Sequence, residues 1–205
     1  MNFLSVKKTK KVLFLLLCAA ISFSRSLAAE VSPEPPVVLF QFSGEIKNAK
    51  VFLTQTSDRS REPAQWTGKY FDFGNLGEAH RIGTHPGIFE QKQVTAIYLQ
   101  PFKESRKTLQ FSQVPPGGTL AFYYGIQDSD IELKESKESN YFYVRIWAGK
   151  KLLQRVRVAR ELGWKRIDIP LGVVSLLTNP IMLSFDVVSD AEPCPALFFD
   201  AAIIK

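Results

Sequence analysis

The sequence predicts an all-β protein, folded as an antiparallel β-sandwich and preceded by a signal peptide. Short runs rich in phenylalanine, valine, isoleucine and tyrosine recur along the chain, and proline, glycine and asparagine separate them. No stretch shows a 3.6-residue period that lasts beyond a turn or two. The first 29 residues combine positive charge, an apolar run and small residues in the order of an export leader.

The export leader is predicted at residues 1–29. Four lysines precede an apolar run of 12 residues at 12–23, and Ser26, Ala28 and Ala29 suit cleavage by a signal peptidase. A spanning helix needs about 20 apolar residues, so a retained membrane anchor is the weaker alternative. Lipid attachment at Cys18 is another alternative, although Leu17 stands where that chemistry requires a small residue. We expect an exported protein, periplasmic or secreted, with no transmembrane span after cleavage.

The rest of the chain is predicted to form one domain. Residues 30–36 read as a proline-rich linker and residues 37–205 as a single β-sandwich domain. The formal net charge of +6 comes mostly from the leader, which holds 5 basic residues and no acidic one. The remainder has 21 basic residues against 20 acidic ones. A nearly neutral exported chain is not expected to bind nucleic acid.

The strands are predicted from alternating or continuous apolar runs that end at turn residues. In chain order they cover residues 37–42, 50–54, 95–100, 108–112, 119–124, 141–147, 152–158, 164–169, 181–188 and 197–204. Residues 148–150 form the turn of a predicted hairpin. The polar segment 55–65 and the charged segment 127–140 are expected to be solvated loops. Side chains expected in the core are Phe122, Phe142, Val144, Ile146, Ile167, Phe185 and Phe199.

Residues 98–204 resemble the galactose-binding-like jelly roll, a β-sandwich found in many carbohydrate-binding modules. The similarity lies in VPPGGTL at 114–120 leading into AFYYG at 121–125, the hairpin at 141–158, GWKRIDI at 163–169 and the two last strands. The resemblance implies a jelly-roll β-sandwich. Several such domains hold a structural calcium ion, but no ligands for it stand out in this sequence, and no other cofactor is expected.

The best candidate site is one face of the predicted hairpin. Because side chains of a strand alternate between its two faces, residues of one parity share a side. The outward set of the hairpin comprises Tyr141, Tyr143, Arg145, Trp147, Lys151, Leu153, Arg155 and Arg157, and Leu152 falls in the set expected to face the core. Aromatic rings and cations together would suit an acidic glycan. The alternative is ordinary packing of arginine stems and cation–π pairs.

A secondary candidate is the segment 78–87, which carries His80, Arg81 and His85. These residues could contact a ligand from a loop, or they could be structural turn residues. A metal site is not predicted, because zinc sites use three or four ligands at recognisable spacing. Cys194 is the one cysteine left after cleavage, so no internal disulfide is expected, and its role as a packed or a reactive thiol stays open.

The sequence holds no nucleophile elbow, zinc-protease motif or phosphate-binding loop, so no catalytic residue is assigned and an enzyme is not the favoured interpretation. We expect a noncatalytic binding domain for an extracytoplasmic carbohydrate, with an acidic one suggested by the hairpin. Two alternatives remain: a structural or adaptor protein of the cell envelope, with an envelope protein as its partner, and a hydrolase.

Overall fold

The computed structural model describes residues 35–74, 76–116, 118–127, 141–159, 161, 163–172, 180–189 and 194–205. The predicted leader, nearly all of the linker and nearly all of the charged loop lie outside these residues. Within the described ranges no helix is long and apolar enough to cross a membrane. The only helices there are two single 3₁₀ turns, η1 (Ile46–Asn48) and η2 (Glu78–His80).

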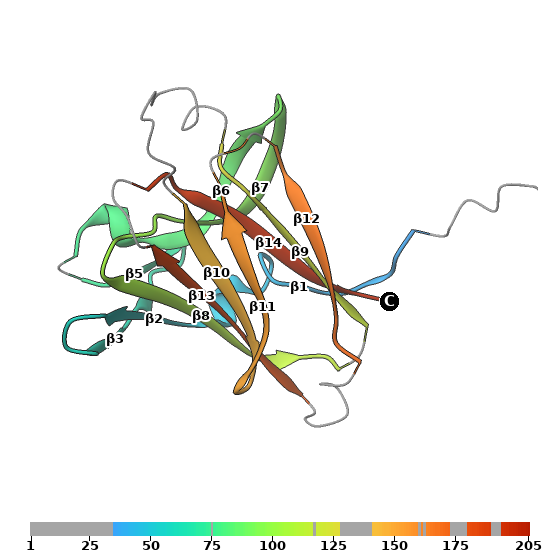
Figure 1. Ribbon diagram of the computed structural model, residues 1–205, viewed down its shortest axis with the longest axis horizontal. Coiled ribbons are helices and arrows are strands. Elements are labelled where there is room, and N and C mark those ends of the chain that lie inside the picture. The colour runs from blue at the N-terminus through green and yellow to red at the C-terminus, as the bar shows by residue number, and fades with distance from the viewer. Residues whose placement is uncertain are drawn as a thin grey trace, which may run out of the picture. The chain divides into compact units, whose positions relative to one another are not determined.

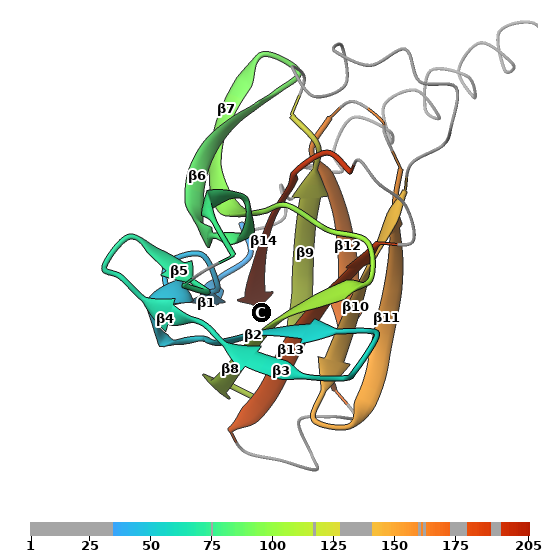
Figure 2. The same ribbon diagram turned by 90° about the vertical axis from the view of Figure 1, so that its left-hand side faces the viewer.

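The domain is a sandwich of two antiparallel sheets (Figures 1 and 2). The six-stranded sheet has the order β11 (Lys151–Val158), β10 (Phe142–Ala148), β13 (Ile181–Ser189), β8 (Ser105–Val114), β2 (Lys50–Gln55), β3 (Arg61–Pro63). The eight-stranded sheet has the order β12 (Lys165–Pro170), β9 (Thr119–Gly125), β14 (Leu197–Ile204), β7 (Lys92–Leu99), β6 (Ile82–Phe89), β5 (Tyr70–Asp72), β4 (Gln65–Trp66), and β1 (Val38–Gln41) also pairs with β14. From β7 onward the chain crosses repeatedly between the sheets, as in a jelly roll. The predicted all-β sandwich is therefore confirmed.

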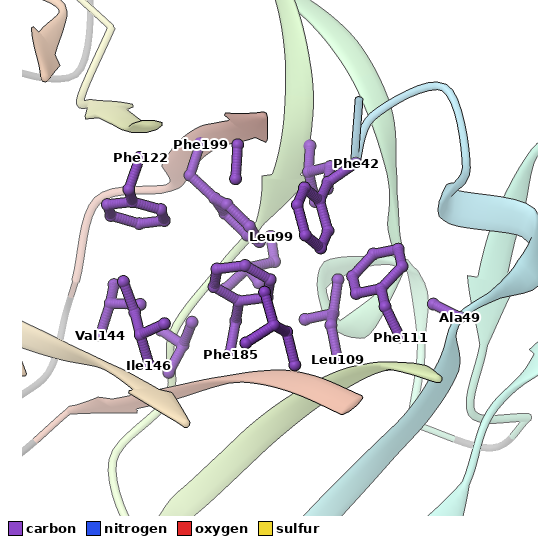
Figure 3. Packing of buried hydrophobic residues seen from close by; sticks show 14 of the residues in the cluster. Phe42, Ala49, Leu99, Leu109, Phe111, Phe122, Val144, Ile146, Phe185 and Phe199 are labelled. Carbon is purple, nitrogen blue, oxygen red and sulfur yellow. The ribbon is translucent and has the colours of Figure 1, made fainter. Parts of the chain in front are cut away.

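Phenylalanine rings fill the space between the sheets (Figure 3). Phe185 packs against Phe122 at 5.8 Å and against Phe199 at 5.5 Å between ring centroids, and all three are fully buried. The predicted core residues Phe142, Val144 and Ile146 are fully buried as well. Ile167 is only partly buried, because β12 lies at a sheet edge and is covered by a single neighbouring strand.

The region between β2 and β7 contains more strands than the sequence predicts. Residues 55–65 are not a loop throughout, since β3 pairs with β2 and β4 begins at Gln65. The prediction also missed β5 and β6. Strands of two or three residues are too short to show a period, and β6 holds Gly83, Pro86 and Gly87, residues that normally interrupt strands. Neighbouring strands supply the hydrogen bonds that the local sequence does not predict.

The predicted hairpin of β10 and β11 forms with one irregularity in its register. Ile146 pairs with Gln154, but Trp147 pairs with Leu152, so Leu153 is the extra residue of a β-bulge. The bulge reverses the predicted facing of two side chains. Leu152 is 43% exposed instead of facing the core, whereas Leu153 packs against the core. Lys151 pairs with Ala148 and so drops out of the predicted outward set.

Candidate functional site

The outward side chains of the six-stranded sheet form rows that run across its strands. One row, from β11 to β3, contains Arg157, Tyr143, Val188, Arg106, Thr54 and Arg61. The next row contains Arg155, Arg145, Asp186, Thr108, Phe52 and Pro63. These rows collect five arginines from four strands but only one carboxylate, so the face is strongly cationic although residues 30–205 as a whole are nearly neutral.

A cavity of about 780 Å³ opens on this face. Its charged lining comprises five cations, Arg59, Arg61, Lys103, Arg106 and Arg145, and one carboxylate, Glu104. Clustered cations of this kind attract anions, and the attraction is strongest where the protein wall excludes solvent from part of the field.

The cavity lining comes from segments that are far apart in the sequence. Arg61 belongs to β3, Arg106 to β8 and Arg145 to β10. The turn between β2 and β3 carries Arg59, whose φ of 60° is held by the Ser60 amide donating to the Asp58 carboxylate at 2.8 Å. That hydrogen bond also lowers the pKa of Asp58. The sequence interpretation of 55–65 as a solvated loop therefore missed two arginines of the lining.

Asp186 is the internal counter-ion of the cationic face. It is buried beneath the neighbouring side chains, accepts a hydrogen bond from the Thr108 hydroxyl at 2.7 Å and lies 3.9 Å from a terminal nitrogen of Arg106. The Arg106 Nε is buried without a hydrogen-bond partner in the described protein. Because Asp186 is a single carboxylate and also accepts a hydrogen bond from Thr108, most of the arginine charge on this face stays uncompensated.

The arginines of the hairpin lie on aromatic rings. The Arg155 guanidinium is 3.7 Å from the Tyr143 ring centroid, and that of Arg157 is 4.0 Å from the Tyr141 ring. Arg61 lies over Phe52 in the same way, at 3.6 Å. Stacking covers one face of each ring, which agrees with the cation–π interpretation, but it leaves the guanidinium N–H groups at the edge available to an anion.

The structure places all six predicted hairpin residues on the same side of the six-stranded sheet as the cavity. Arg145 lines the cavity directly. Tyr143 and Arg157 lie in the row of Arg106, and Arg155 lies beside Arg145. Trp147 is half-buried one row further along, next to Leu152, and its indole N–H has no partner in the described protein. Tyr141 precedes β10 and contacts Tyr143 edge-on at 5.5 Å.

The secondary candidate residues are divided between two places. Arg81 and His85 line another cavity, of about 320 Å³, on the eight-stranded sheet. His80 instead stacks on Phe102, with ring centroids 4.1 Å apart. Burial, and then the charge of Lys107, lower the pKa of His80.

Metal ligands and thiol chemistry receive no support from the described residues. No three histidine, cysteine, aspartate or glutamate side chains in those ranges gather as a metal site would require. Cys194 is buried, with its Sγ 2.7 Å from the Ser189 hydroxyl, so it lies out of reach of a substrate in solution. A structural calcium ion stays a prediction from the family resemblance.

No protein-family model matches the chain, and no curated protein matches its sequence. Similar solved structures include the tandem CBM51 modules of a family 98 glycoside hydrolase from Streptococcus pneumoniae SP3-BS71 (14% identity, 75% of this chain, 44% of that chain, TM-score 0.43). The present chain thus spans less than half of that structure. Another is the mannan-recognising carbohydrate-binding module TmCBM27 (14% identity, 83% and 97% coverage, TM-score 0.41). A third is a Stig cyclase from Fischerella sp. TAU (8% identity, 86% and 92% coverage, TM-score 0.39).

Two of these three structures are carbohydrate-binding modules, the class of β-sandwich that residues 98–204 resemble. At TM-scores below 0.5 the likeness carries no argument about what this chain binds. A functional conclusion has to come from the site itself, whose cations, cavity and arginine stacks suit the binding of an extended anion.

Proposed function

We propose that this protein is an exported, noncatalytic domain that binds an acidic carbohydrate on the outer face of its six-stranded sheet. The observation that carries the proposal is the cavity of about 780 Å³ whose lining has five cations and one carboxylate. Export rests on the predicted leader at residues 1–29, and an exported protein meets carbohydrates rather than nucleic acid as its common polyanions.

Arginine accounts for most of the charge on this face, and that favours carboxylate or sulfate groups. A guanidinium offers a planar fork of N–H donors that matches two oxygens of one anionic group. Three of the arginines are already held on aromatic rings, so less side-chain entropy is lost when they bind.

The extent of the face favours a chain of sugars over a single small anion. Six strands lie side by side from β11 to β3. With about 4.8 Å between neighbouring strands, the cationic rows extend over about 24 Å. A polymer lying across the strands would meet arginines at both ends of a row and in the cavity between them.

The lining of the cavity supports binding rather than hydrolysis. Glycosidases generally use two carboxyl groups on opposite sides of the scissile bond. Among the described residues that line the cavity, Glu104 is the single carboxylate. A single carboxylate does not provide the pair of acid and base that this mechanism uses.

The proposal is tested by binding to immobilised polysaccharides that differ in charge. We expect the protein to be retained on polygalacturonate or dextran sulfate and not on neutral dextran. Arg61→Ala and Arg145→Ala should each weaken binding about tenfold, as loss of a charged hydrogen bond does. The matched control is Arg166→Ala, an exposed arginine of β12 on the other sheet that pairs with Asp168 at 2.8 Å.

Added salt provides a second criterion. Exposed ionic contacts are screened over about 10 Å at 0.1 M salt, so retention should fall as the ionic strength rises. Equal retention on neutral dextran would refute the acidic specificity. No retention on any of the three polysaccharides would favour the alternative role, a structural or adaptor protein of the cell envelope. Release of reducing ends from any of them would favour the hydrolase.

A further inference from the structure

We propose a second binding site, separate from the cationic face, in a pocket around Gly83 on the outer face of the eight-stranded sheet. The ligand class that fits it is a single neutral sugar ring. Strands β5, β6 and β7 are neighbours in the eight-stranded sheet (Figure 2), and residues of all three line the pocket.

The pocket lies over a glycine whose partners in the strand register have large side chains. Gly83 of β6 pairs with Tyr70 of β5 on one side and with Tyr98 of β7 on the other. Along the chain, Arg81 and His85 share the outward parity of Gly83. Four large side chains thus surround a position that has none, and the resulting cavity has a volume of about 320 Å³.

The glycine is required by a close approach of backbone. A Cβ atom at position 83 would lie 3.0 Å from the Lys69 carbonyl oxygen and 3.1 Å from the Tyr70 Cβ. Both distances are tighter than ordinary van der Waals contact, so a side chain here would displace β5. The floor of the pocket is therefore bare backbone, with the two tyrosines about 10 Å apart across two strand spacings.

The charges around the pocket balance, in contrast to the cationic face, because Lys69 and Arg81 are matched by Glu78 and Asp72. The Arg81 guanidinium donates to Asp72 at 3.1 Å and to Glu78, and it lies 4.3 Å from the centroid of the Tyr70 ring. These hydrogen bonds raise the pKa of Arg81 further. A guanidinium that is already paired with two carboxylates has little charge to offer an anion, so an acidic ligand gains little here.

The walls combine apolar and polar surface, and their rings contact neighbouring rings. Tyr98 packs against Phe198 with ring centroids 5.1 Å apart, and His85 lies 5.7 Å from Tyr98. The His85 Nδ1 is 2.8 Å from the Pro86 carbonyl oxygen, which can only accept a hydrogen bond. The His85 Nδ1 is therefore the donor of this hydrogen bond, and in the tautomer that it selects the Nε2 atom is an acceptor.

These groups match the chemistry of a pyranose. Its C–H face is apolar and would lie against the tyrosine rings, while its hydroxyls need donors and acceptors around the edge. The Tyr70 hydroxyl, the His85 Nε2 and the exposed carboxylate of Glu78 provide both kinds. A volume near the lower end of the range for ligand pockets admits one ring rather than a polymer.

The experiment is amide chemical-shift mapping of the isotope-labelled protein with methyl glycosides of glucose, galactose and mannose, each up to about 50 mM, a range that detects millimolar affinity. We expect at least one glycoside to shift the amides of Gly83, Thr84 and Tyr98 and to leave Arg145 unshifted. His85→Ala should weaken that binding about fivefold, and because His85 is exposed the variant should remain folded. Arg61→Ala on the other sheet should leave it unchanged.

The outcomes separate this site from the cationic one. If polygalacturonate is not bound but a glycoside shifts Gly83, the proposed function fails and the second site stands. If no glycoside shifts Gly83, or if shifts appear only around Arg145, the second site is refuted.

Discussion

Lys107 provides the sharpest test of the described packing, because it is a lysine buried inside the sandwich. Its side chain is 1% exposed, and its Nζ donates to the Gln100 carbonyl oxygen at 2.7 Å. Burial lowers its pKa from 10.5 to about 7. In the unfolded chain the amine takes up a proton below about 10.4, so between these values the unfolded state binds more protons than the folded state.

The sign and size of the effect follow from this difference. Stability should rise as the pH rises from about 7 to about 10.5, and the penalty for burying the charge is fully present below about pH 7. A pKa difference of this size corresponds to about 5 kcal/mol. Lys107→Met removes that penalty but leaves the Gln100 carbonyl without its donor, which costs about 1–3 kcal/mol. The variant should be more stable than the wild type by about 2–4 kcal/mol at pH 6, and less stable by about 1–3 kcal/mol near pH 10.5.

The assay is urea unfolding of both proteins at several pH values, followed by tryptophan fluorescence. Comparison at the same pH cancels the titration of the groups that the two proteins share, except for His80, whose pKa the charge of Lys107 lowers. The expected result is that the two curves of unfolding free energy against pH cross. Parallel curves would mean that Lys107 reaches water in the folded protein, and the described burial would then be wrong.

Two further predictions concern the fold. Phe185→Ala should lower the free energy of unfolding by about 3–5 kcal/mol, because the ring is fully buried among Phe122, Phe199 and other rings, and a loss below about 1 kcal/mol in urea unfolding would contradict the described core. Gly118→Ala should lower the free energy of unfolding by about 2 kcal/mol or more, since φ is +73° and the new Cβ would lie 2.2 Å from the Ile204 carbonyl oxygen. The control is Gly172→Ala, because a Cβ atom at that position meets open space. Equal melting temperatures for the two variants would count against the close contact between Gly118 and β14.

The fold was largely predictable where the sequence pattern is regular. The alternation of Phe142, Val144 and Ile146 with polar neighbours places them in the core without any tertiary information. The reversal at Leu152 was not predictable in the same way. A β-bulge arises from how two strands fit together, and nothing in the β11 sequence alone distinguishes it from regular alternation.

The candidate site was predictable only in part, for the same physical reason. Parity within one hairpin brings Tyr143, Arg145 and Arg157 to one face, because hairpin partners are adjacent in the sequence. The arginines of β3 and β8 join that face only through strand pairing between distant segments. Arg61 is followed by Glu62 in the sequence, but strand alternation places these two side chains on opposite faces of the sheet.

By itself, the sequence determined the all-β class, the hairpin and most of the core, since each depends on a local period of apolar side chains. Only the tertiary structure decided where the cations gather and which glycine lies among large side chains. Strand order and register bring together residues that lie far apart in the sequence, such as Thr54 and Ser189 in the cavity lining, which are 135 positions apart. Such pairings depend on hydrogen bonds and packing between whole strands, and no local pattern in the chain encodes them.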